Sequence, residues 1–276
     1  MLHFTVLIWS NAMTDTFENA YQGLILDILS HGEDRSDRTG VGTRSLFGAN
    51  IQFDCSTAPV ITKRQMYTAG VIGEYCAFMR GFTDNRDFRA FGCNYWTPWA
   101  DGDRLGPIYG AQWRNFNQSN QVDQIDQLIK TARINPHSRQ MVVSAWNPLQ
   151  TEQMALPPCF HSFQVLINRN QLNIQVNQRS ADVMIGLPSD AILHYLLMLT
   201  LCEEIGTTPG RINFAIGDAH IYNNHIDSVP DYITGKAGNP GTIRLINYRG
   251  LNHLTPDNFE HEGYVSHNKI KFEINV

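Results

Sequence analysis

The sequence predicts a single domain of the α+β class. Segments with a helical spacing of apolar residues are separated by short runs in which apolar and polar residues alternate, as they do in strands. The segment 191–205 is apolar on nearly all sides, which is typical of a buried central helix, and Gly206 ends it. No internal repeat or linker divides the chain. We therefore expect one domain over residues 13–276, with residues 1–12 as an N-terminal extension or a cloning remnant.

The order of the expected elements follows from these periodicities. Apolar residues from 17 to 28 recur on one helical face, and Gly32 ends that helix. Alternating runs at 163–167 and 172–176, joined by a short turn, predict a β-hairpin. Further helices are expected at 65–80 and 122–135, and further strands at 47–53, 141–146, 213–216, 242–246 and 270–276.

Composition argues against several classes of protein. The net charge is -5 at pH 7, so no basic face for duplex nucleic acid is expected, and a few local arginines must hold any anionic ligand. The 5 cysteines are scattered and form no CxxC pair, which favours free thiols in a reducing cytoplasm. No apolar run is long enough to cross a membrane. We therefore expect a cytoplasmic protein whose partners include neither a nucleic-acid polymer nor a membrane.

Cys159 is the residue to which we assign the chemistry. It follows Pro157 and Pro158, which restrict the approach of the chain, and it precedes the first strand of the hairpin. A cysteine held in this way can act as a nucleophile. Taken alone, a single cysteine is more often a small buried hydrophobic residue. The choice therefore depends on the residues around it.

Several other features each allow two interpretations. Glu74 lies among apolar residues of a predicted helix, so it is either a buried carboxylate with a raised pKa or a residue of the outer face. Arg38 lies in a glycine-bearing loop, which holds a phosphate or is a simple solvated turn. Asp190 lies near the start of the central helix, where the helix dipole stabilises an acid. The aromatic and glycine-rich loops at 94–99 and 105–110 line a cleft or cover the core.

Taken in order along the chain, these motifs resemble those of the thymidylate synthase family. The matching residues are Asp37-Arg38-Thr39-Gly40, Glu74, Trp96, Trp99, Gly106-Pro107-Ile108-Tyr109-Gly110, Pro158-Cys159, Gln178-Arg179-Ser180-Ala181-Asp182, Gly186-Leu187-Pro188 and Gly217-Asp218-Ala219-His220-Ile221-Tyr222. The resemblance runs from Met13 to the tail at 262–264. It implies a thymidylate synthase-like fold, in which a large mixed β-sheet is packed by helices around one buried central helix, and it implies a homodimer.

The resemblance also implies a role for each matched residue. Cys159 would be the thiolate that adds to C6 of a pyrimidine, after which C5 attacks the methylene of 5,10-methylenetetrahydrofolate. Arg179 would lower the pKa of this thiol, Glu74 would organise proton transfers, and Tyr109 would lie near the proton lost from C5. The residues implied to bind the nucleotide are Arg38, Arg179, Ser180, His220, Tyr222 and, from the partner subunit's copy of the chain, Arg139. Those implied to bind the folate are Lys63, Trp96, Trp99, Asp182, Gly186 and Val276, and no metal is expected.

Asp190 departs from the family pattern, which has an asparagine there, after proline and phenylalanine. An asparagine amide donates to O4 of uracil and accepts from N3–H, whereas an ionised carboxylate only accepts. Cytosine offers N4–H donors, and N3–H when protonated, so Asp190 suits dCMP and should discriminate against dUMP. The deoxycytidylate hydroxymethylases of bacteriophages also carry Asp here. We therefore predict dCMP as the substrate, and a host cytoplasm as the location if the protein is phage-encoded.

Two further departures concern neighbours of matched residues. Phe160 stands where a histidine normally follows the cysteine, so the pocket beside the pyrimidine should be drier. Gln140 stands where a second arginine usually follows Arg139, so phosphate binding should be weaker unless another cation compensates.

The product depends on the last chemical step. After tetrahydrofolate leaves, the exocyclic methylene takes hydride from the folate and gives 5-methyl-dCMP, or it takes water and gives 5-hydroxymethyl-dCMP. Trp96, Trp99 and the tail at 262–276 favour a dry site. We therefore prefer methylation, with hydroxymethylation as the alternative.

Two competing functions come from other classes. His31-Gly32-Glu33 and Pro158-Cys159 resemble parts of the zinc cytidine deaminase signature, but Ser162 replaces its second cysteine and the two halves lie far apart. A non-catalytic protein that binds nucleotides or RNA on the same fold would not need the cysteine, the arginine and the glutamate together.

Overall fold

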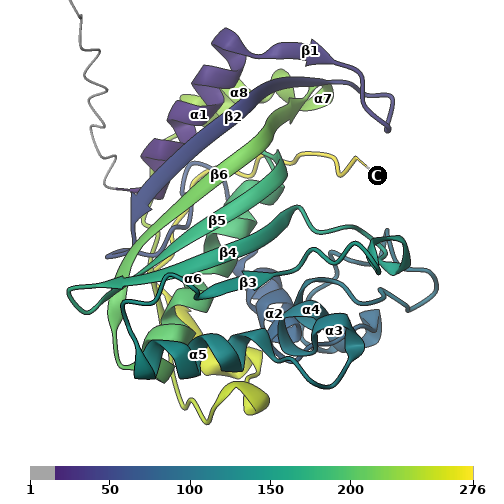
Figure 1. The fold of residues 1–276 in the computed structure, drawn as a ribbon. Coiled ribbons are helices and arrows are strands. Elements are labelled where there is room, and N and C mark those ends of the chain that lie inside the picture. The colour runs from purple at the N-terminus through teal and green to yellow at the C-terminus, as the bar shows by residue number, and fades with distance from the viewer. Residues whose placement is uncertain (1–15, 276) are drawn as a thin grey trace, which may run out of the picture.

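A six-stranded mixed sheet forms the centre of the computed structural model, which describes residues 16–275 (Figure 1). Its strand order is β1-β2-β6-β5-β4-β3, and only β5 and β6 are parallel among its neighbouring pairs. The strands of this sheet are β1 (Glu33–Arg35), β2 (Thr43–Asp54), β3 (Val142–Ser144), β4 (Phe160–Asn168), β5 (Gln171–Asp182) and β6 (Thr208–Tyr222). A separate antiparallel pair consists of β7 (Thr242–Leu245) and β8 (Phe259–Glu262).

Helices pack against this sheet and against one another. The α-helices are α1 (Phe17–His31), α2 (Thr68–Met79), α3 (Asn85–Ala90), α4 (Tyr109–Arg114), α5 (Gln124–Ile134), α6 (Gly186–Ile205), α7 (Asn223–Ile226) and α8 (Val229–Ile233). Short 3-10 turns are η1 (Phe116–Gln118), η2 (Thr151–Gln153), η3 (Leu251–His253) and η4 (Pro256–Asn258). The class and the thymidylate synthase-like arrangement expected from the sequence are confirmed.

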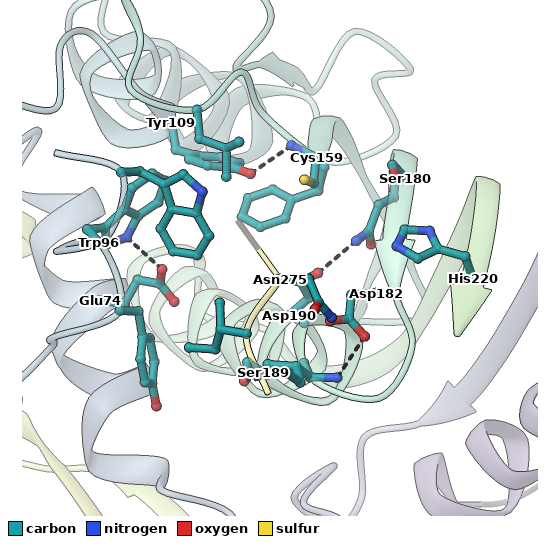
Figure 2. Close-up of a pocket in the computed structure, with 18 of the residues that line it drawn as sticks. Glu74, Trp96, Tyr109, Cys159, Ser180, Asp182, Ser189, Asp190, His220 and Asn275 are labelled. Atoms are coloured by element: carbon teal, nitrogen blue, oxygen red, sulfur yellow. Dashed lines mark hydrogen bonds between the residues drawn. The ribbon is translucent and has the colours of Figure 1, made fainter. Parts of the chain in front are cut away.

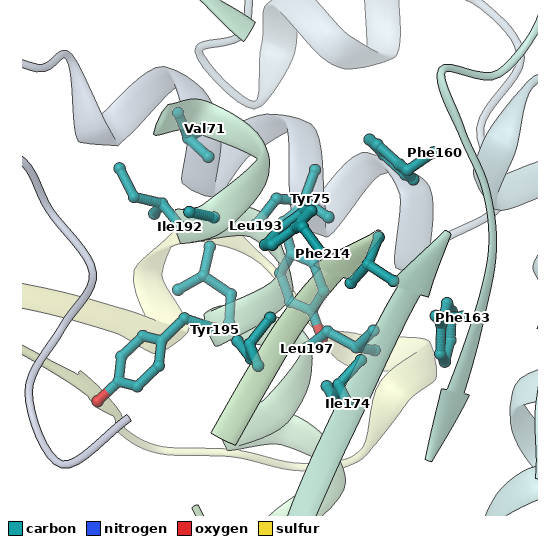
Figure 3. Packing of buried hydrophobic residues seen from close by; sticks show 14 of the residues in the cluster. Val71, Tyr75, Phe160, Phe163, Ile174, Ile192, Leu193, Tyr195, Leu197 and Phe214 are labelled. Carbon is teal, nitrogen blue, oxygen red and sulfur yellow. The ribbon is translucent and has the colours of Figure 1, made fainter. Parts of the chain in front are cut away.

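Helix α6 is the buried central helix. It contacts β5 and β6 on one side and α2 and α5 on the other. Side chains from α2, α6 and the sheet, among them Tyr75, Leu197 and Ile174, belong to one apolar cluster (Figure 3). The helix begins earlier than predicted because Pro188 lies in its first turn, where the missing N–H has no helical partner to lose. Gly206 ends it with a left-handed backbone at φ 82, as predicted.

Strand directions bring polar residues to one edge of the sheet. Because β5 and β6 are parallel, their carboxyl ends meet at the same edge, and β4 starts there because it runs antiparallel to β5. In this register Asp182 is opposite His220, and Ser180 is opposite Asp218. Figure 1 shows α2 and α4 close to this region of the sheet.

Two expected strands need correction, and some other expectations fall outside the described residues. The strand predicted to end at 216 continues through Gly217 to Tyr222, because β2 and β5 pair with β6 on both sides. The strand predicted at 270–276 is absent within 270–275, where the chain has no regular secondary structure and joins neither sheet. The suggested extension at 1–12, the start at Met13 and the terminal Val276 lie outside the described part of the chain.

Candidate active site

A cleft of about 450 Å³ opens at this edge of the sheet (Figure 2). Most of the predicted site residues line it, namely Arg38, Glu74, Trp96, Trp99, Tyr109, Cys159, Phe160, Arg179, Ser180, Asp182, Gly186, Asp190, His220 and Tyr222. The fold therefore gathers residues that are widely separated in the sequence. Lys63 and Arg139 are not among the lining residues, and Val276 is not described.

Cys159 is half-buried immediately before β4. Its backbone N–H donates to the Tyr109 hydroxyl at 2.7 Å, and Nη2 of Arg179 lies 4.0 Å from its Sγ. Burial raises the pKa of the Cys159 thiol, while the Arg179 charge lowers it. Arg179 therefore lowers the pKa of the thiol as expected, but the effect of burial is larger.

Arg179 is held beside the thiol by the backbone of the two prolines. Its Nε donates to the Pro158 carbonyl at 2.9 Å, and its Nη2 donates to the Pro157 carbonyl at 2.8 Å. The guanidinium also lies 6.0 Å from the ring of Trp146. Because Arg179 is exposed, its remaining N–H groups can reach a ligand anion as well as the sulfur.

Glu74 projects from α2 into the opposite wall of the cleft (Figure 2). Its Oε1 accepts a hydrogen bond from the Trp96 indole at 2.8 Å. Burial, followed by the Asp190 charge, raises the pKa of Glu74 to about 8, against a smaller opposing effect of the Trp96 bond. A carboxyl with this pKa is largely protonated at neutral pH and can both donate and accept a proton. Of the two interpretations above, the buried carboxylate is the one the structure supports.

Asp190 lies in the second turn of α6 and not in the first. Its Oδ2 accepts from Gln178 Nε2 at 2.7 Å. Burial raises the pKa of Asp190 to about 7, although the Gln178 bond lowers it. Within residues 16–275 its Oδ1 makes no hydrogen bond, and the residue lines the cleft. Asp190 therefore offers one unused carboxyl oxygen to a ligand.

Aromatic side chains form the wall next to the thiol. Phe160 packs on Tyr109 with ring centroids 4.3 Å apart, and its other neighbours include His194 at 4.8 Å. Tyr109 begins α4, whose Gly110 lies so close to α2 that an added Cβ would come within 2.0 Å of the Phe78 carbonyl oxygen. This close contact of α4 with α2 sets the position of Tyr109 in the cleft.

Polar groups occupy the wall formed by β5, β6 and the loop before β2. Ser180 and His220 lie at the ends of β5 and β6, and Tyr222 is the last residue of β6. The exposed Arg38 follows Asp37, whose carboxylate accepts from Thr39 N at 3.2 Å and from Gly42 N at 2.9 Å. The loop is therefore an ordered turn that presents an arginine to the cleft.

Asp182 ends β5 and shapes the turn into α6. Its Oδ1 accepts from the backbone N–H groups of Met184 at 2.9 Å and Ile185 at 3.1 Å. Gly186, which begins α6, also lines the cleft. The folate contact implied for Asp182 remains a prediction.

Lys63 and Arg139 occupy other places. The Lys63 ammonium donates to the Ile233 carbonyl at 2.9 Å and to Gln22 Oε1 at 3.2 Å. Arg139 is exposed outside the cleft of its own chain, as is Gln140. The implied roles of both basic residues therefore stay predictions.

Several lining residues were given no role in the sequence analysis. Gln178 belongs to a matched motif, and the buried Arg64 directly follows Lys63. The only sequence signal that could have indicated a role in the cleft was thus the position of each residue beside a matched one. Ile274 and Asn275 also line the cleft. Both belong to the tail at 262–276, which the resemblance implied would close a dry site, although neither residue was singled out.

Contacts of the tail hold it against this region. His225 Nε2 lies 2.8 Å from the Glu273 carbonyl oxygen, and the Phe272 ring lies 5.0 Å from the His225 ring. The Arg64 guanidinium lies 5.1 Å from the Phe272 ring centroid. The last described residues thus form part of the cleft wall.

This arrangement suits an enzyme that forms a covalent bond through a cysteine beside an arginine. A family model described as thymidylate synthase matches residues 19–276, and the chain belongs to the thymidylate synthase family. The protein is thus a one-carbon transferase that acts at C5 of a pyrimidine nucleotide, with methylenetetrahydrofolate as co-substrate.

Two further features of residues 16–275 concern membranes and metal ions. No helix there is both long and apolar enough to cross a membrane. No group of three or more His, Cys, Asp and Glu side chains there is arranged to hold a metal ion.

Proposed function

We propose that the protein transfers a one-carbon unit from 5,10-methylenetetrahydrofolate to C5 of dCMP and produces 5-methyl-dCMP. The carboxyl of Asp190 carries the choice of base. Gln178 occupies one of its oxygens at 2.7 Å and leaves the other for the ligand. N4–H of cytosine can donate to that oxygen, whereas O4 of uracil would face it with a lone pair.

The proton on Asp190 completes the pairing with cytosine. N3 of neutral cytosine is an acceptor, so one proton must lie between N3 and the carboxyl. Since burial raises the pKa of Asp190 to about 7, the carboxyl can supply that proton near neutral pH. Transfer of the proton towards N3 also makes C6 more electrophilic, which assists attack by a thiolate.

The other residues of the cleft have complementary tasks. Cys159 attacks C6 as its thiolate, with Arg179 stabilising the negative sulfur at 4.0 Å. Glu74, which accepts a hydrogen bond from Trp96, transfers protons to and from the substrate. The Tyr109 hydroxyl accepts a hydrogen bond from the backbone N–H of Cys159 and so lies beside the nucleophile. The bound folate supplies the one-carbon unit and, for methylation, the hydride.

The chain has groups that fit a flat, partly polar folate ring system. Trp96 and Trp99 present indole rings to the cleft, and Ile274 adds an apolar side chain from the tail. Trp99 Nε1 is buried and has no hydrogen-bond partner among the described residues, so it is a donor that a ligand can satisfy.

The apolar wall supports methylation over hydroxymethylation. Phe160 packs on Tyr109, Trp96 hydrogen-bonds Glu74, and the tail adds Ile274, so apolar side chains surround this part of the cleft and disfavour water there. One observation favours the alternative product, 5-hydroxymethyl-dCMP. Ser189 places a hydroxyl in the cleft where the family has phenylalanine.

Mass spectrometry of the nucleotide product separates the two outcomes. With dCMP and methylenetetrahydrofolate, methylation adds a methyl group and releases dihydrofolate, which absorbs near-ultraviolet light differently from tetrahydrofolate. Hydroxymethyl-dCMP with no dihydrofolate would replace the preferred product by the alternative. An unmodified nucleotide under conditions where dUMP is converted would refute the choice of dCMP.

A homodimer is part of the same proposal. Arg139 is exposed and lies outside the cleft of its own chain, which is consistent with donation of its guanidinium to a partner subunit. In Figure 1, no helix formed by residues 16–275 covers the near face of the sheet, and we infer that a second copy packs there. Side chains on these strands include the exposed Val142 and Leu166.

A further inference from the structure

We propose that Asp218 is a positioning residue for His220, the side chain that the family resemblance places against the 3′-hydroxyl group of the nucleotide sugar. The inference rests on the proposed function, because it takes the ligand to be a nucleotide whose sugar lies against His220. It adds a residue that touches neither the base nor the reacting atoms.

The sheet register brings the parts of this pair together. On β2 and β6, Ser45 is opposite His220, and Phe47 is opposite Asp218. Ser45 Oγ donates to Asp218 Oδ1 at 2.6 Å, and Arg35 Nη1 lies 3.5 Å from Oδ2. Ser45 therefore anchors the carboxylate, whereas Arg35 adds only a long, exposed ion pair.

His220 turns one nitrogen towards this carboxylate. Its Nδ1 lies 3.5 Å from Asp218 Oδ1, is shielded from solvent and has no other partner among the described residues. The interaction with His220 is the main reason that the pKa of Asp218 is lowered, so the carboxylate stays ionised and acts as an acceptor. An acceptor beside Nδ1 favours the tautomer that carries its proton on Nδ1.

The tautomer decides what His220 can recognise. With the proton on Nδ1, Nε2 has a lone pair and accepts a hydrogen bond. Figure 2 shows the His220 ring at the cleft wall formed with Ser180 and Asp182. A sugar hydroxyl can donate to Nε2, whereas a 3′-deoxy sugar, or a 3′-oxygen esterified within a polynucleotide, has no such proton. Modification would thus precede incorporation of the nucleotide into a chain.

Nucleotide binding tests the proposal when dCMP is compared with 2′,3′-dideoxy-CMP. In the wild-type full-length protein, loss of the 3′-hydroxyl should weaken binding about tenfold, as expected for a hydrogen bond to an oriented imidazole. Asp218→Leu should weaken dCMP binding by about the same factor and leave dideoxy-CMP binding unchanged. Asp218→Asn keeps an acceptor oxygen and should retain most of the discrimination. Arg35→Gln, which changes the exposed ion pair of the same carboxylate, is the matched control.

The outcomes separate positioning from a general structural role. Equal weakening of both nucleotides in Asp218→Leu, or undiminished discrimination, would overturn the proposal. If Asp218→Leu does not fold, Ser45→Ala can replace it, because it removes the 2.6 Å hydrogen bond to Asp218. It should reduce the discrimination between dCMP and dideoxy-CMP about threefold, and unchanged discrimination would overturn the proposal. The same measurements with dUMP and its dideoxy form report the base preference independently. An error in the choice of dCMP would therefore not be mistaken for an error in the role of Asp218.

Discussion

Burial sets the protonation of the reactive side chains in the cleft. It raises the pKa of Cys159, Glu74 and Asp190, and the described neighbours that oppose it are Arg179, Trp96 and Gln178. The ordered motifs, through their resemblance to a family, identified the first three residues but not the environment that gives each its proton. A nucleotide phosphate near Arg179 would draw on the same positive charge that stabilises the sulfur. Nucleotide position and thiol reactivity are therefore linked.

Replacement of the nucleophile should separate binding from turnover. Cys159→Ala should abolish product formation, because no covalent bond to C6 can form, and it should leave the dissociation constant of dCMP within about threefold. Steady-state turnover and equilibrium dCMP binding measure the two effects. Cys202→Ala, at a buried thiol of α6, is the control and should remain active. Turnover by Cys159→Ala would show that another group attacks the pyrimidine.

The raised pKa of Asp190 predicts a pH-dependent stability difference. Its pKa is about 7 in the fold against 3.8 in its ordinary state, so the folded protein binds more protons between these values and loses stability as the pH rises through them. Asp190→Asn should therefore be more stable than the wild type at pH 8. This difference in the free energy of unfolding is at most about 4 kcal/mol, because a shift of one pKa unit corresponds to about 1.36 kcal/mol. The difference should shrink towards pH 4.

Urea unfolding at a series of pH values measures this difference. Asp84 provides a control of opposite sign, since hydrogen bonds from Arg86 lower the pKa of its carboxyl to about 2. Asp84→Asn should lose stability relative to the wild type above about pH 4. A pH-independent difference for Asp190→Asn would show that its carboxyl ionises as freely as one in water.

At the scale of elements, the hairpin and the central helix were predictable from the sequence, whereas the local structure of the tail was not. Alternation identifies β4 and β5, and continuous apolar character identifies α6, because their burial repeats along the chain. Residues 270–275 also alternate, but a strand needs a neighbour that shares its backbone hydrogen bonds, and these residues form no ladder with another strand. The tail is held by Arg64 and His225, which are remote in sequence.

The tail should contribute to closure over the folate. Phe272→Ala removes the ring between Arg64 and His225 and should lower turnover about tenfold, with dCMP binding unchanged. It should also increase the fraction of hydroxymethyl product, because water gains access. Product analysis under single-turnover conditions measures both effects. Lys271 is exposed, so Lys271→Ala is the control. Equal turnover and equal product fractions in the two variants would contradict a role of the tail in closing the cleft.

At the scale of the whole molecule, local patterns indicated the class of the fold but not which residues meet. Glu74, Cys159 and Asp190 come together because α2 packs on α6 and because β4 begins beside the carboxyl end of β5, and periodicity contains no information on such packing. The ordered motifs indicated which residues meet, through their resemblance to a family. Where neither source applied, as for Gln178 and its bond to Asp190, the contact emerged only from the structure.

The proposed dimer can be tested by complementation between two inactive chains. Arg139→Ala should weaken catalysis strongly if its guanidinium enters the partner's cleft. A mixture with Cys159→Ala should regain activity, because a mixed dimer contains one cleft with both residues intact. Activity after mixing and refolding, with the separate variants as controls, is the measurement. Absence of recovery in a mixture shown to contain mixed dimers would place Arg139 in its own subunit's function.

Competition between dCMP and dUMP tests the central claim most directly. Both nucleotides are supplied at equal concentration with methylenetetrahydrofolate, and the ratio of modified products gives the ratio of their kcat/KM values. The wild type should favour dCMP by on the order of a hundredfold or more, and Asp190→Asn should shift the ratio towards dUMP, because an amide donates to O4. A wild-type preference for dUMP, or an unchanged ratio in Asp190→Asn, would contradict the account.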